Sequence, residues 1–157
     1  MSVFAPSELL FLNGDRFATE PPLFSSDAAI SLHHTDRSVS MPDLGRAILA
    51  TAFLVNEREG VFDLVPAERK RWFGLLWGTV LHVVPRGASY VWPSGSVEAH
   101  VADIAIDLAA SGKPVEVEDV VYRLLKEDHQ QPYRHLFDLL DAGLAERELL
   151  EVQQRKV

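Results

Sequence analysis

Cysteine is absent from this sequence of 157 residues. The absence excludes disulfide bonds, zinc sites with thiolate ligands, iron–sulfur clusters and cysteine nucleophiles. The N-terminal stretch also lacks the basic region and the long apolar run of a secretory signal peptide. Because nothing points to an oxidising compartment, we expect a cytoplasmic protein.

Long apolar runs are missing as well. The longest stretch without acidic or basic side chains around the tryptophans covers only residues 72–85, whereas a helix needs about 20 apolar residues to cross a bilayer. The apolar fraction of 47% and the charged fraction of 24% are typical of a globular protein that buries a core. We therefore predict one globular domain over residues 1–157.

Familiar catalytic motifs are also lacking. The sequence contains no G-x-S-x-G, no S-x-x-K and no glycine-rich phosphate loop, so no nucleophile or phosphate site is indicated. Its 6 histidines are scattered and form no H-E-x-x-H pattern, which favours surface histidines over a metal site. We expect a non-enzymatic protein without a cofactor or metal.

Positive charge is scarce except in the middle of the chain. Residues 1–60 hold 4 basic and 8 acidic side chains, and residues 96–157 hold 7 and 13, whereas residues 61–95 hold 4 and 2. The net charge of −8 argues against general attraction to nucleic acid or anionic lipid. Any anion-binding surface is therefore expected in the middle segment.

Apolar residues at helical spacing predict a mainly α fold with a small β component. The segment PSELLFL at 6–12 predicts a short helix with Ser7 as its N-cap. Residues 19–42 predict a loop with one short helix near 27–32. A long core helix is expected over 42–60, and its apolar face consists of Leu44, Ile48, Leu49, Ala52 and Phe53.

The middle of the chain predicts the β component. VFDLV at 61–65 predicts a short strand, and ERKR at 68–71 predicts one helical turn after Pro66. The β-rich stretches TVLHVV and SYVW flank PRGA, so a hairpin is expected over 79–92.

The C-terminal part predicts three helices. Ser96 is the expected N-cap of the first, which ends near Gly112. The second covers 116–126, and the third covers 132–143 with Gly143 as its C′ cap. The expected inward residues are Val97, Val101, Ile104, Leu108, Val117, Val120, Val121, Leu124, Leu125, Leu136, Phe137 and Leu140.

Three helices followed by a strand or further helix at 144–152 resemble a winged-helix module. Residues 132–142 would then be the recognition helix. Asp138 and Asp141 on that helix would repel phosphates, which argues against nucleic acid as a partner. A winged-helix-like regulatory or protein–protein interaction domain remains the alternative function. Its candidate cations are Arg123, Lys126 and Arg134.

Basic and aromatic residues are concentrated in ERKRWFGLLW, residues 68–77. Cations and rings together are typical of an interfacial membrane anchor. The alternative, which we favour, is that Trp72 and Trp77 belong to the core, because most tryptophans are buried. The basic trio stays a candidate in either case. The candidate residues for binding anionic lipid or another ligand are Arg46, Arg69, Lys70, Arg71, Trp72, Arg86 and Trp92.

Four segments resemble, in order, the Golgi phosphoprotein-three-like family, whose eukaryotic members are phosphatidylinositol-4-phosphate-binding adaptors. They are PSELLFL, LGRAILATAFLVNEREGVFDL, PSGSVEAHVADIA and PYRHLFDLLDAGLAERELLEV. The resemblance implies a mainly helical, non-enzymatic adaptor whose 79–92 hairpin mediates formation of a homo-oligomer.

The departures from the family limit what is carried over. The family's acidic pair falls at His100 and Val101 here, and its early tryptophan has no counterpart, because the first tryptophan is Trp72. Only Arg46 lies near one of its headgroup-binding positions. We therefore expect an adaptor that binds an anionic, phosphoinositide-type membrane peripherally, or else a protein partner, without assigned lipid specificity.

Overall fold

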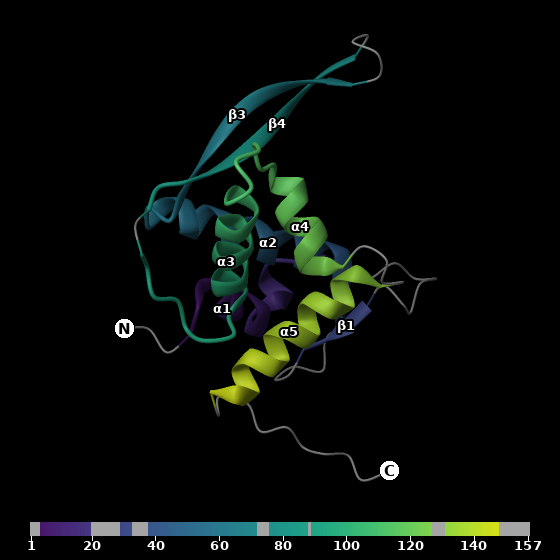
Figure 1. Ribbon diagram of the computed structural model, residues 1–157. Coiled ribbons are helices and arrows are strands. Elements are labelled where there is room, and N and C mark those ends of the chain that lie inside the picture. The colour runs from purple at the N-terminus through teal and green to yellow at the C-terminus, as the bar shows by residue number, and fades with distance from the viewer. Residues whose placement is uncertain are drawn as a thin grey trace.

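The computed structural model describes residues 4–19, 29–32, 38–71, 76–87, 89–126 and 131–147. The fold is mainly α with a small β component, as the sequence predicts (Figure 1). Its elements in chain order are α1 (Pro6–Leu12), the 3₁₀ turn η1 (Gly14–Arg16), β1 (Ala29–Ser31), β2 (Ser38–Ser40), α2 (Met41–Arg58), β3 (Phe62–Arg71), β4 (Leu76–Pro85), α3 (Val97–Ala109), α4 (Val117–Leu125) and α5 (Pro132–Glu146).

Helix α2 is the central helix, and α1, α3 and α5 pack against it. It begins after Ser40, whose hydroxyl accepts a hydrogen bond from the backbone N–H of Asp43 at 3.5 Å, and Pro42 lies in its first turn. Its predicted apolar face is buried as expected. One continuous core joins α1, α2, α3, α4, α5 and the first residues of β3.

The three C-terminal helices are confirmed, with one correction at the end. Ser96 caps α3 by accepting from Ala99 N–H at 3.3 Å, and α4 begins with a capping box between Glu116 and Asp119. Gly143, however, lies inside α5 and is no C′ cap, since the helix continues to Glu146. Residues 144–146 are therefore helical, Arg147 is the C-cap of the helix, and residues 148–152 of the predicted terminal element lie outside the described residues.

The N-terminal loop contains strand rather than helix. Where a short helix was expected near 27–32, residues Ala29–Ser31 form β1 and pair antiparallel with β2, with Ile30 opposite Val39. The pairing partner lies beyond the local window, so local spacing favoured the wrong element. Residues 27 and 28 lie outside the described ranges.

The hairpin is displaced from its predicted position. β3 pairs antiparallel with β4 from Phe62↔Pro85 to Arg71↔Leu76, so the two strands are connected through residues 72–75, which lie outside the described ranges, and residues 89–92 belong to no strand. The helical turn expected at 68–71 is also wrong, because these residues continue β3. We call residues 62–71 and 76–85 the β3–β4 arm.

Pro66 explains why β3 continues through a residue that suggested a helix start. Leu64 N–H points away from β4 and donates to Glu57 Oε1 at 3.4 Å. Alternation along the strand puts the nitrogen of Pro66 on the same outer edge, where no ladder bond is lost. In Figure 1 the arm rises above the helices and extends away from them.

Candidate functional site

The outer end of the β3–β4 arm carries three successive basic residues. The register places Arg69 opposite Gly78, Lys70 opposite Trp77 and Arg71 opposite Leu76. The structure does not describe the side chains of Arg69, Lys70, Arg71, Leu76 and Trp77. It describes no part of Trp72. Ten residue pairs span about 30 Å at the rise of a β-strand, so these cations stand far from the buried base.

The arm combines buried side chains at its base with exposed apolar side chains. At the base, Phe62 and Val83 belong to the hydrophobic core. The register places Val65 and Val84 on the opposite face and Leu81 on the same face as Val83, and these three side chains expose between 41% and 46% of their surface. Exposed apolar side chains on a projecting hairpin are typical of a contact surface.

Both edges of the arm are closed near its base. On β3, Leu64 N–H is bonded to Glu57 and Pro66 has no N–H. On β4, Val83 N–H donates to Val115 O at 2.7 Å. A closed edge cannot accept another strand, so the basal half of the arm is protected against strand addition.

Arg86 and Arg46 lie away from the end of the arm. Arg86 is at the base, where its Nε lies 3.3 Å from Asp63 Oδ2 in an exposed ion pair. Arg46 is near the start of α2, 3.5 Å from Asp43. Since twelve residues of helix cover about 18 Å, the length of α2 separates Arg46 from the arm.

Trp92 is held on the helical body. Its Nε1–H donates to Asn56 Oδ1 at 2.8 Å, and its ring centroid lies 4.3 Å from that of Tyr90. Asn56 is fully buried and donates in turn to the main-chain oxygens of Ala52 and Glu98 at 2.8 and 3.1 Å. Trp92 therefore joins the loop before α3 to α2, with its polar atom engaged inside the protein.

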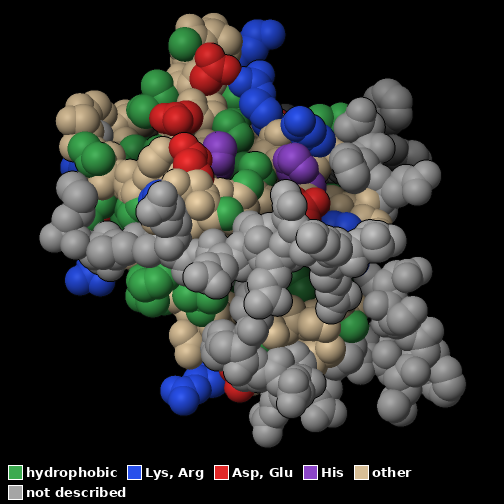
Figure 2. All heavy atoms as spheres, turned by 90° about the horizontal axis from the view of Figure 1, so that it is seen from below, with side chains coloured by type: hydrophobic (Ala, Val, Ile, Leu, Met, Phe, Trp, Pro, Cys, Tyr) green, Lys and Arg blue, Asp and Glu red, His purple; other side chains and the backbone are tan. Residues whose placement is uncertain are grey.

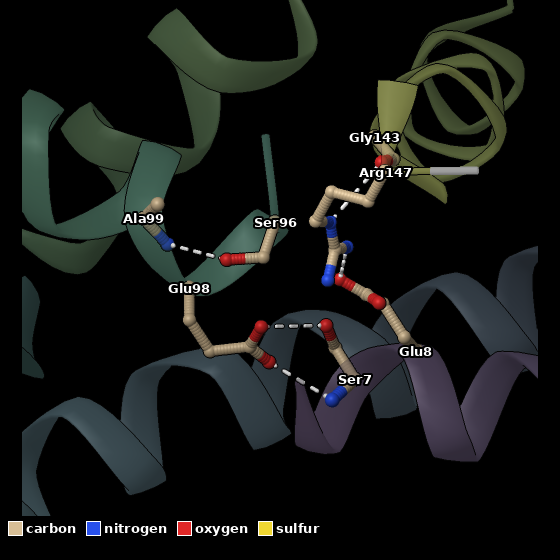
Figure 3. A network of polar contacts seen from close by, with 7 residues as sticks. All are labelled: Ser7, Glu8, Ser96, Glu98, Ala99, Gly143 and Arg147. Atoms are coloured by element: carbon tan, nitrogen blue, oxygen red, sulfur yellow. Dashed lines mark hydrogen bonds and ion pairs between the residues drawn. The ribbon is translucent and has the colours of Figure 1, made fainter. Parts of the chain in front are cut away.

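A buried polar network links α1, α3 and the end of α5 (Figure 3). Ser7 donates to both oxygens of Glu98, through its backbone N–H at 2.9 Å and its hydroxyl at 2.9 Å. Arg147 pairs with Glu8 Oε1 and donates from Nε to Gly143 O at 3.1 Å. We call Ser7, Glu8, Glu98 and Arg147 the glutamate junction.

Burial controls the electrostatics of this junction. Glu8 is 1% exposed and Glu98 is 0% exposed. Burial raises the pKa of Glu8, the Arg147 guanidinium lowers it in part, and the charge of Glu98 raises it further. Burial also raises the pKa of Glu98, and the hydrogen bonds from Ser7 oppose that shift.

Sequence reasoning missed the junction. Ser7 and Glu8 look like an ordinary N-cap and first-turn acid, although the N-cap of α1 is Ala5. Glu98 looks like another first-turn acid. The only local sign is an acid between the apolar residues of PSELLFL.

Shallow hollows lie on the surface of the described part. One of about 490 Å³ lies between α4 and the start of α5, with Tyr122 and Tyr133 in its wall. Two of about 440 and 220 Å³ flank Leu9 on α1. Within the described residues, no three histidine, aspartate or glutamate side chains gather as metal ligands, and no described helix is long and apolar enough to cross a membrane.

The rival cations of the α3–α5 region are largely engaged. Arg123 pairs with Asp107, and Arg134 Nε donates to Gln131 Oε1 at 2.8 Å. Comparisons of this chain with family models, with curated proteins and with solved structures find no match. The function must therefore be argued from the arm and the junction themselves.

Proposed function

We propose that this chain is a non-enzymatic adaptor module that binds anionic membrane surfaces peripherally through the outer end of the β3–β4 arm. The observation that supports this most is the placement of Arg69, Lys70 and Arg71 in the last three residue pairs of the ladder. The role also agrees with the adaptor family that the sequence resembles.

Distance makes the arm suitable for this task despite a net charge of −8. Charges are screened over about 10 Å at 0.1 M salt, and the arm is about 30 Å long. The cations at its end are therefore separated from the acidic body by several screening lengths. On the face of the helices that points away from the arm, acidic and basic side chains are interspersed (Figure 2).

The expected strength follows from the number of cations. Each basic side chain near an anionic surface contributes about 1 kcal/mol, so three contribute about 3 kcal/mol, or roughly 150-fold in affinity. The aromatic residues of the same segment, Trp72, Phe73 and Trp77, add groups that suit the polar–apolar boundary of a bilayer. Binding of this kind weakens as salt is added.

Liposome flotation tests the proposal. The protein is mixed with neutral vesicles, with vesicles containing phosphatidylserine, and with phosphoinositide vesicles of equal charge. We expect flotation on the anionic vesicles, lost in high salt and in an Arg69/Lys70/Arg71→Ser variant. Flotation that favours the phosphoinositide at equal charge would identify a headgroup preference.

A matched control removes the same charge elsewhere. Arg16, Arg58 and Lys113 are exposed on the helical body, so an Arg16/Arg58/Lys113→Ser variant has the same net charge as the arm variant. We expect this control to float like the wild type. If neither wild type nor control floats, or if both variants lose binding equally, the arm is not a membrane-binding element.

Self-association through the arm is a second candidate, favoured by the exposed Val65, Leu81 and Val84. The closed basal edges favour contact through the faces of the arm, with Val65 and Val84 on one face and Leu81 on the other, rather than through strand addition. Sedimentation velocity of the wild type and a Val65/Leu81/Val84→Ser variant tests this. A wild type that stays monomeric across concentrations contradicts it.

A further inference from the structure

The glutamate junction holds more negative charge than its surroundings balance. Two buried carboxylates face one guanidinium, that of Arg147, whose side chain is 15% exposed. From α2 the junction receives only the neutral Asn56, which bonds to the main-chain oxygen of Glu98. At the end of α5 another acid, Glu146, has a carboxylate oxygen close to Gly95, in the loop that leads to α3. Two ionised glutamates would leave one buried charge without a counter-charge among the described residues, and burial of such a charge is costly.

The hydrogen-bond donors at the junction are also too few for two ionised carboxylates. Glu98 receives a donor on each oxygen, both from Ser7. Glu8 receives Arg147 on Oε1, while its Oε2 is buried and has no hydrogen-bond partner among the described residues. An ionised carboxylate needs donors on both oxygens, whereas a neutral carboxyl group tolerates an unpaired oxygen at lower cost.

We propose that Glu8 and Glu98 form a proton-binding site, in which the folded protein retains one shared proton at pH values where exposed glutamates are already ionised. The proton makes the junction neutral together with Arg147. Because the charge of Glu98 raises the pKa of Glu8, the titrations of the two groups are coupled. This inference is independent of the proposed function of the arm.

The site controls how firmly α1 is held. Helix α1 has only 7 residues, too few to be stable without its contacts. Ser7 joins it to α3, and Glu8 joins it to the end of α5 (Figure 3). Loss of the shared proton puts two like charges at this joint and loosens α1.

The direction of the pH effect follows from linkage. Burial raises the pKa of both carboxyl groups in the folded state, so the closed junction binds more protons than the opened one. The stabilisation is complete below the ordinary glutamate pKa and is lost as pH rises through the raised folded value. Across that window the opening of α1 should increase by up to about tenfold per pH unit for one proton.

Carboxyl-detected NMR of the full chain tests the proton directly. The Cδ resonances of Glu8 and Glu98 are followed against pH, with the exposed Glu59 as internal reference. We expect both to titrate above Glu59, and the remaining one to shift toward Glu59 when its partner is changed, as in Glu98→Gln or Glu8→Gln. Titration of both together with Glu59 in the wild type would overturn the proposal, and this measurement needs no variant to fold.

Hydrogen exchange of the α1 amides tests the loosening. After correction for the intrinsic pH dependence, protection of α1 in the wild type should fall as pH rises through the titration window. The Glu98→Gln variant should lack this dependence, while a Glu59→Gln control should keep it. If Glu8 and Glu98 are confirmed to titrate above Glu59 but the protection of α1 does not change with pH, the coupling between the proton and α1 is overturned.

Discussion

Replacement of Gly143 by alanine should destabilise the protein, although alanine is the better helix former. Gly143 lies in the middle of the last turns of α5, directly against the loop that carries Gly95. A Cβ at position 143 would stand 2.5 Å from the carbonyl oxygen of Gly95 and 3.0 Å from its carbonyl carbon. Ordinary contact at a Cβ is 3.4–4 Å, so helix and loop must separate by about 1 Å.

The magnitude follows from two opposing effects. Overpacking of this kind costs about 1–3 kcal/mol, and the neighbouring Leu140 and Leu144 are buried, so α5 cannot move without opening the core. The gain in helix propensity from glycine to alanine is about 1 kcal/mol. We therefore expect Gly143→Ala to lower the free energy of unfolding by about 1 kcal/mol, and up to 2 kcal/mol where the loop cannot yield.

Urea denaturation followed by far-UV circular dichroism measures this change. Ala142→Gly, at the exposed neighbouring position, calibrates helix propensity and should cost about 1 kcal/mol. If Gly143→Ala instead stabilises the protein by as much as Ala142→Gly destabilises it, propensity alone operates, and the close approach of α5 to the Gly95 loop is refuted.

Two further experiments probe the loop and the arm. Trp92→Phe removes the donor to the buried Asn56 Oδ1 and should cost about 1–3 kcal/mol in the same urea assay; an unchanged midpoint would mean that this hydrogen bond contributes nothing. Pro66→Val provides an outward N–H on the edge of β3, so we expect concentration-dependent association by sedimentation velocity, increased further by Glu57→Ala. Monomeric behaviour of the double variant would show that this edge does not limit association.

The helices were predictable because the residues that determine each helix are close together in the sequence. Buried residues at a spacing of 3.6 give each helix its face, and Leu44, Ile48 and Phe53 illustrate this in α2. The cap at Ser96 could be predicted for the same reason, since a side chain meets a backbone N–H three residues away.

The arm and the junction were not predictable because their partners are distant in the sequence. Pro66 and the polar ERKR suggested a helix start, and only the pairing of β3 with β4 gives these residues an extended conformation. In the junction, Ser7 and Glu98 are 91 residues apart, and Glu8 and Arg147 are 139 apart. The basic trio was predicted as a candidate, but its place at the end of an arm depends on the register.

The separation of Glu8 from Arg147 also has a consequence for synthesis of the chain. Arg147, the partner of Glu8, follows α5 and is therefore synthesised after every helix of the described fold. Until then α1, made first, has a buried acid without its cation and cannot settle in its final place. The two ends of the described chain thus complete the fold together, and a chain that terminates before Arg147 would carry this incomplete joint permanently.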